Sequence, residues 1–107
     1  MKHGATHFEA GGSAELVNAV GLHARPAVKL TQLAKSFLCQ VEIALNPTGP
    51  WVDAKSPVKV MRVRAPHGAV VHVRTTGPDA RDATAAILDL IRKGFGEDDL
   101  ARQGSHG

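Results

Sequence analysis

The sequence predicts an α+β fold in which a four-stranded antiparallel sheet carries three helices on one face. Segments with helical spacing and segments with the alternation of strands follow one another in the order β-α-β-β-α-β-α. The helical segments carry apolar stripes, and one sheet is the economical way to cover several such stripes. The chain has 107 residues, which suffice for one two-layer core and not for a second.

The first strand is expected at residues 13–18, which include Leu16 and Val17. Residues 1–12 mix histidine, glycine and polar side chains without a period, and we interpret them as a flexible leader or an expression remnant. The end of the chain has the same character, so residues 98–107 are expected to form a flexible tail. The domain is therefore predicted to span residues 13–97.

An amphipathic helix is expected next, over residues 24–37. Its apolar positions recur every three or four residues, at Ala27, Leu30, Leu33, Ala34 and Phe37. Residues 40–46 then alternate apolar and other side chains, as a half-buried strand does. Turn residues follow, and residues 51–54 are predicted to return antiparallel to that strand.

The second half of the chain predicts a helix, a strand and a helix. Ser56 precedes Pro57, and this pair favours a helix start with the serine as N-cap; the short helix is expected to end near Val63. Residues 69–75 alternate and are predicted to be the last strand. A turn then leads into a helix with a clear apolar stripe, which is expected to end near Gly94.

Composition places the chain among globular proteins and narrows its surroundings. Thirteen Lys and Arg against ten Asp and Glu give a formal charge of +3, which suits an acidic partner or a phosphorylated ligand. These charges are dispersed, unlike those of a nucleic-acid-binding tail. Cys39 is the only cysteine, so a reducing compartment is expected, with the thiol packed rather than reactive. No apolar stretch is long enough to cross a bilayer. We therefore expect a cytoplasmic monomer that binds no nucleic acid and does not insert into membranes.

The stretch from Gly21 to Ala27, GLHARPA, indicates the chemistry. His23 stands at the start of the expected helix, where backbone N–H groups lack intrahelical acceptors and the helix dipole favours an anion. A neutral imidazole is a nucleophile, and Arg25 can hold phosphate oxygens with two donors at once. Pro26 fixes the backbone of the first turn. His23 could thus accept a phosphoryl group, hold it as a phosphoramidate and pass it on.

These residues resemble the histidine-containing phosphocarrier family, HPr, of the bacterial phosphoenolpyruvate-dependent sugar phosphotransferase system. The resemblance covers roughly residues 13–97. It rests on GLHARPA, on Ala54-Lys55-Ser56, on the spacing from Met61 to Gly68 and on Gly94-Phe95-Gly96-Glu97. It implies an HPr-like open-faced β-sandwich, whose order of elements agrees with the order predicted above.

The resemblance also implies roles and partners. Enzyme I would phosphorylate His23 on Nδ1, Arg25 would hold the phosphate, and the IIA domains of sugar permeases would receive it. Such a phosphocarrier is an intermediate in two transfers rather than a turnover enzyme on its own, and no cofactor or metal is expected. Ser56 matches the regulatory serine that HPr kinase/phosphorylase modifies in some bacteria. Pro57 follows it where a larger apolar residue is usual, and Arg64 stands where small residues are common.

Alternatives stay open beside this hypothesis. The same fold could serve a regulatory relative in a nitrogen-related branch, whose phosphorylation state is read by a regulator. Small RNA-binding domains also combine a basic four-stranded sheet with helices, but three Phe, one Trp and no Tyr leave no stacking pairs of the kind they use. His67 and His72 as metal ligands lack an accompanying Cys or carboxylate cluster. A hydrolase with His23 as base lacks a nucleophile with a paired carboxylate.

Overall fold

The computed structural model describes residues 8–96, and within them the predicted order of elements is confirmed. The strands are β1 (Glu9–Glu15), β2 (Gln40–Ala44), β3 (Val52–Asp53) and β4 (Val70–Thr76). The helices are α2 (Ala24–Lys35), α3 (Pro57–Val63) and α4 (Ala80–Arg92), followed by a 3-10 turn, η1 (Gly94–Gly96). The tail expected at residues 98–107 and most of the expected leader lie outside the described residues.

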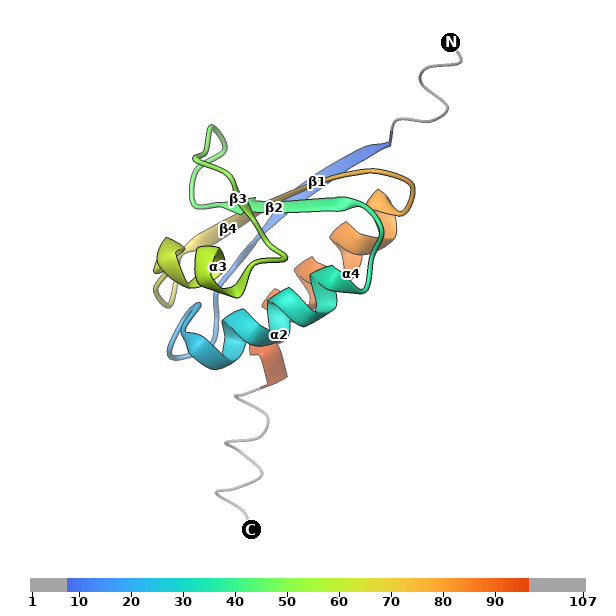
Figure 1. The fold of residues 1–107 in the computed structure, drawn as a ribbon. Helices are drawn as coiled ribbons and strands as arrows, with labels where there is room; N and C mark the ends of the chain where they lie inside the picture. The colour runs from blue at the N-terminus through green and yellow to red at the C-terminus, as the bar shows by residue number, and fades with distance from the viewer. Residues whose placement is uncertain (1–7, 97–107) are drawn as a thin grey trace.

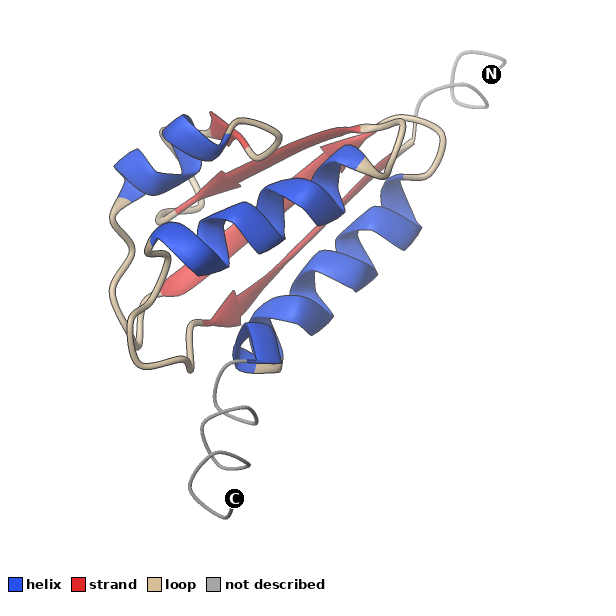
Figure 2. Cartoon of the chain, turned by 60° about the horizontal axis from the view of Figure 1, so that its bottom comes forward, coloured by secondary structure: helices blue, strands red, loops and turns tan. Residues whose placement is uncertain are grey.

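The strands form one four-stranded antiparallel sheet, as expected, and the structure gives their order in the sheet as β1-β4-β2-β3. The longest pairing joins β1 to β4, from Glu9 opposite Thr76 to Glu15 opposite Val70. The helices lie on the same side of this sheet (Figures 1 and 2). Helix α4 packs on β1 and β4, whereas α3 packs on α2 and β3. The described residues place no helix on the other face, so the fold is the predicted open-faced sandwich.

Burial along β4 follows the pleat that the sequence predicts. Val71, Val73 and Thr75 face the helices and are at most 2% exposed, whereas Val70 and Arg74 on the other face are exposed. The core continues into α2, where the predicted stripe is buried at Ala27, Leu30 and Ala34. Within residues 8–96, no helix has the length and apolar character that crossing a membrane needs.

The first strand differs from its prediction. It spans Glu9–Glu15 instead of residues 13–18, so residues 9–12 belong to the sheet and not to a leader. Two glycines in this stretch have no side chain and therefore give no alternation to read. Gly12 faces the helices, and a Cβ there would come within 2.7 Å of Leu88 Cδ1. The missing side chain is thus what lets α4 approach the strand.

Helix α2 also ends earlier than predicted, at Lys35 instead of Phe37. Ser36 caps the last turn: its N–H and its hydroxyl both donate to the carbonyl of Leu33, at 3.0 and 2.6 Å. The tighter turn stops the helix, and Phe37 then packs against the core from the following loop. Its apolar side chain therefore fits the helical stripe although its backbone is not helical.

Two hydrogen bonds join the loop between α2 and β2 to the residue that precedes α4. The Asp79 carboxylate accepts hydrogen bonds from the N–H groups of Leu38 and Cys39, both at 2.8 Å. The bond from Leu38 is the main cause that lowers the pKa of Asp79. Cys39 is 1% exposed, and burial, followed by the adjacent Asp79, raises the pKa of its thiol to about 11. The predicted packed cysteine is confirmed.

Candidate functional site

His23, the third residue of GLHARPA, directly precedes helix α2. It is the N-cap of α2, with extended backbone (φ −83°, ψ −170°), and its carbonyl accepts the N–H of Ala27 at 2.9 Å. Its side chain makes no capping hydrogen bond and is exposed. A serine at this position would turn its hydroxyl onto the helix, whereas the imidazole is left available.

The start of α2 provides a local positive field. Pro26 lies in the first turn, is buried and has no N–H, so Ala24 and Arg25 carry the donors that lack an intrahelical acceptor. No acidic residue stands in this turn to compensate the helix dipole. A negative group bound to the His23 ring would therefore lie next to unpaired donors and a positive helix end.

The loop before His23 is held by its neighbours. The N–H of Leu22 donates to the carbonyl of Ala65 at 2.9 Å, which joins the β1–α2 connection to the α3–β4 connection. Gly21 makes this approach possible: its φ is +66°, and a Cβ there would lie 2.3 Å from Ala65 O. The buried Asn18 side chain donates to the carbonyl of Gly21 at 2.8 Å, and the Nδ1 atom of His67 lies 3.1 Å from Asn18 O. These contacts set the position of His23.

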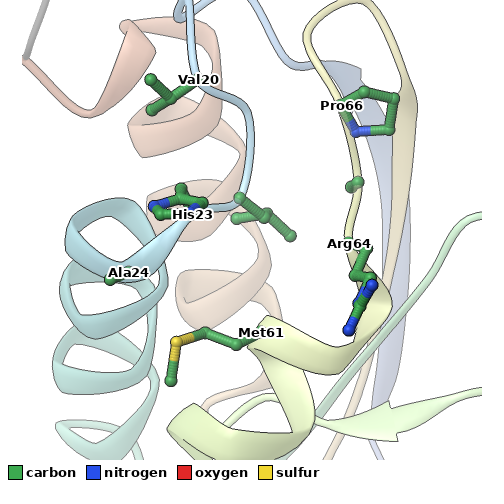
Figure 3. Close-up of a pocket in the computed structure, with 8 residues that line it drawn as sticks. Val20, His23, Ala24, Met61, Arg64 and Pro66 are labelled. Carbon is green, nitrogen blue, oxygen red and sulfur yellow. The ribbon is translucent and has the colours of Figure 1, made fainter.

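The two connections enclose an open pocket of about 500 Å³ beside the imidazole (Figure 3). One wall comes from the segment before and at the start of α2, and the other comes from α3 and the residues after it. The lining residues are Val20, Leu22, His23, Ala24, Met61, Arg64, Ala65 and Pro66. The pocket is therefore mostly apolar, with one imidazole and one guanidinium on opposite sides.

The predicted site residues fall in three places. His23 lines the pocket. Arg25 is exposed on the first turn of α2, next to His23 along the chain but outside the pocket lining. Ser56 lies at the other end of α3 from the pocket residue Arg64 and is the N-cap, accepting the N–H of Lys59 at 3.3 Å. The capping role predicted for Ser56 is thus confirmed.

Helix α3 divides its apolar side chains between the core and the surface. Val60 is fully buried and Val63 is half-buried, whereas Val58 and Met61 are 53% and 37% exposed. Met61 lines the pocket opposite Val20, which is 56% exposed. Because Val58 is three residues before Met61 on the helix, it extends the same face. An apolar surface therefore adjoins His23.

Four basic residues lie close together along the chain around α3, at Lys55, Lys59, Arg62 and Arg64, but they do not act as one unit. The Lys55 ammonium donates to the carbonyl of Phe37 at 2.8 Å. This bond joins the segment before α3 to the loop after α2. Arg62 is exposed, whereas Arg64 lines the pocket. Arg64 was expected on the surface that partners use, but the pocket that it shares with His23 was not predicted. A contact between segments about forty residues apart has no local signal to reveal it.

The fold is an open-faced sandwich, and its first helix begins with an exposed imidazole at the N-cap. These two features define the class of small phosphocarrier domains. Residues 12–93 match the family described as the PTS HPr component phosphorylation site, and the chain belongs to this HPr family. The protein is accordingly a phosphocarrier of the phosphotransferase system.

Particular relatives support this assignment. The phosphocarrier protein HPr of Cupriavidus necator is 48% identical over 82 residues, which cover 77% of this chain and 90% of that protein. The phosphocarrier protein NPr of Escherichia coli K12 is 36% identical over 84 residues, covering 78% and 92%. The crystal structure of HPr from Thermoanaerobacter tengcongensis superposes with a TM-score of 0.75 at 34% identity, covering 81% of this chain and 96% of that one.

Proposed function

We propose that His23 is the phosphoacceptor of this phosphocarrier, that Enzyme I is the donor and that IIA domains of sugar permeases are the acceptors. The observation that carries the proposal is that the imidazole at the start of α2 is exposed and makes no capping hydrogen bond to the helix. Within residues 8–96 the other exposed histidine, His67, lies in the turn before β4 with its Nδ1 atom near Asn18 O. Only at His23 do an accessible ring and an anion-favouring helix start coincide within residues 8–96.

In the proposed transfer the imidazole of His23 forms and then breaks the bond to phosphorus. The lone pair of a ring nitrogen, Nδ1 by resemblance to the family, forms the N–P bond while the bond from phosphorus to the donor breaks and the donor keeps its electron pair. The reverse sequence hands the group to the acceptor. The backbone donors of Ala24 and Arg25 stabilise the added negative charge, and the Arg25 side chain holds the phosphate oxygens.

The apolar surface beside His23 supports the proposed partners. Val20, Met61 and Val58 expose hydrophobic area next to a group that must enter another protein's active site. Burying this area against Enzyme I or a IIA domain would exclude water and so protect the phosphoramidate from hydrolysis during transfer. The net charge of +3 favours acidic partner surfaces.

The test is incubation with phosphoenolpyruvate, magnesium and purified Enzyme I from the same organism, followed by intact-mass spectrometry. The wild type should gain one acid-labile phosphoryl group, and His23→Ala should gain none. His72→Ala is the matched control, because His72 lies on β4, on the sheet face away from the helices, and should leave the modification intact. Modification of His23→Ala to the same extent would refute the assignment.

The nitrogen-related branch is the second candidate, and the 36% identity to NPr of Escherichia coli is the observation that favours it. The 48% identity to an HPr keeps the sugar branch in front. Rates of phosphoryl transfer from the Enzyme I of each branch separate the two. A higher rate from the nitrogen-branch donor would reverse the order.

Regulation at Ser56, a cytoplasmic location and a monomeric state stay predictions. Ser56 is partly exposed and caps α3, so a kinase would have to take its hydroxyl from that bond. Incubation with ATP and HPr kinase/phosphorylase, with Ser56→Ala as control, tests the modification. An acid-stable phosphate that the alanine variant lacks is the expected result.

A further inference from the structure

Arg64 adopts a backbone conformation that an arginine disfavours. It is the C-cap of α3, with φ 53° and ψ 40°, in the left-handed region where glycine is the residue without steric penalty. Phe95 is the other non-glycine residue with positive φ within residues 8–96, and it is 2% exposed in the core. The Phe95 side chain thus has a packing role that accounts for its backbone.

The Arg64 side chain has no such structural role. It is exposed, and among residues 8–96 its guanidinium makes neither a hydrogen bond nor an ion pair, whereas Arg74 pairs with Glu42 at 2.7 Å. Strained backbone at a residue whose side chain stabilises nothing is typical of a functional position. The question is therefore what this guanidinium contacts when the protein works.

The position of Arg64 answers that question. The hydrogen bond from Leu22 N to Ala65 O places His23 one residue after its donor and Arg64 one residue before its acceptor. Both residues line the same pocket, with His23 on one wall and Arg64 on the other (Figure 3). No carboxylate lines the pocket between them. A dianion attached to the imidazole would therefore have a free guanidinium across the pocket.

We propose that Arg64 binds the phosphoryl group on His23 from the α3 side of the pocket, as a second guanidinium opposite Arg25. The inference rests on the proposed function of His23 and extends it. The Arg64 backbone is fixed, since its N–H donates to Met61 O at 3.1 Å. Its side chain is long and unpaired, so rotation about its side-chain bonds brings the guanidinium to the phosphate oxygens once these are present.

The proposal predicts a measurable shift in the phosphoryl group itself. A cation close to a phosphate favours the dianion and lowers the pKa of its last proton. The charged and titratable groups of the surrounding elements are Arg25 and the helix start of α2, Arg64 at the C-cap of α3, and the His67 side chain in the turn before β4. Removing Arg64 should raise the phosphoryl pKa by about half a pH unit, as expected for one partly screened charge at short range.

The experiment bypasses Enzyme I, so that it depends only on the phosphorylated protein. The protein is phosphorylated chemically with phosphoramidate, and the signal of phosphorylated His23 is identified by its absence in His23→Ala. Its pKa is then measured by phosphorus NMR titration in the wild type, Arg64→Gln, Arg64→Lys and Arg62→Gln, while the ring protons of His67 are followed in parallel. Arg62→Gln is the matched control, because Arg62 is an exposed arginine of α3 outside the pocket lining.

The outcomes separate this proposal from the proposed function. A higher phosphoryl pKa in Arg64→Gln, restored in part by Arg64→Lys and unchanged in Arg62→Gln, supports the contact. Equal values in wild type and Arg64→Gln, or equal shifts in both glutamine variants, overturn it even if Enzyme I phosphorylates His23 normally. Failure of Enzyme I to phosphorylate the wild type, with the pKa shift present, would instead refute the donor and leave the Arg64 contact standing. Amide NMR spectra of each variant confirm that it is folded.

Discussion

Replacing Arg64 with glycine should make the protein more stable while removing a residue proposed to bind phosphate. A non-glycine residue in the left-handed region is disfavoured by about 1–2 kcal/mol relative to glycine. Glycine returns part of that gain, about 0.5–1 kcal/mol, through the larger backbone entropy of the unfolded chain. Because the Arg64 side chain makes no polar contact among residues 8–96, little else is lost. We expect a net gain of about 0.5–1 kcal/mol in the free energy of unfolding.

Thermal and urea unfolding followed by circular dichroism would measure this gain. For a domain of this size the expected gain corresponds to a rise in Tm of about 3–6 °C. Arg64→Ala keeps a Cβ and with it most of the strain, so it should stay close to the wild type. Arg62→Gly places glycine inside helix α3 and should instead lose about 1 kcal/mol. Equal or lower stability of Arg64→Gly, with an unchanged m-value, would show that the left-handed cap is not strained.

Three further substitutions or measurements test the framework around the site. Gly21→Ala should lower the free energy of unfolding by more than about 2 kcal/mol, because its Cβ would lie 2.3 Å from Ala65 O at a φ of +66°. Ser56→Ala should lower it by about 1 kcal/mol through loss of the cap to Lys59, whereas Ser56→Asp should keep the cap. The Cys39 thiol, with a pKa of about 11, should react with iodoacetamide at pH 8 far more slowly in the folded protein than in urea. Because this pKa is raised above its ordinary value of 9.0, its contribution to stability is present below pH 9 and is lost as the pH rises toward 11.

Contrary results would be informative in each case. Native stability of Gly21→Ala would mean that the two connections can separate freely. Equal losses in Ser56→Ala and Ser56→Asp would attribute the effect to something other than the cap. Equally fast alkylation of Cys39 in folded and unfolded protein would show that the α2–β2 loop opens on the timescale of the reaction.

The elements that the sequence predicted well are those in which the pattern of apolar and polar side chains shows which face is buried. The alternation of β4 and the stripe of α2 are direct consequences of burying one face, so they could be found without the structure. The prediction placed strand β1 too late in the chain, because the glycines in its first half have no side chains that could show an alternation. Phe37 led to the opposite error: it lies two residues past the end of α2, and its apolar side chain continues the helical pattern although its backbone is not helical.

In the candidate site, too, residues close together in the sequence could be predicted, whereas contacts between distant segments could not. His23 and Arg25 could be singled out as candidates from the sequence, because both stand within the first turn of a helix that the sequence predicts. The second wall of the pocket comes from residues 61–66, and only the fold brings them to His23. Gly21 offered a usable signal, because a glycine beside a site often marks a close approach of backbones. Nothing in the sequence signals a left-handed arginine at residue 64, since glycine is the usual residue there.

The hydrogen bond between Leu22 and Ala65 is made by backbone atoms on both sides. Substitutions in the neighbouring side chains therefore leave it intact, provided that Gly21 is kept. The wall contributed by α3 can consequently change its charge and size over evolution while the imidazole keeps its place. A lineage could in this way adapt to new phosphotransfer partners by exchanging residues such as Met61 and Arg64, while the proposed phosphoacceptor His23 stays in place.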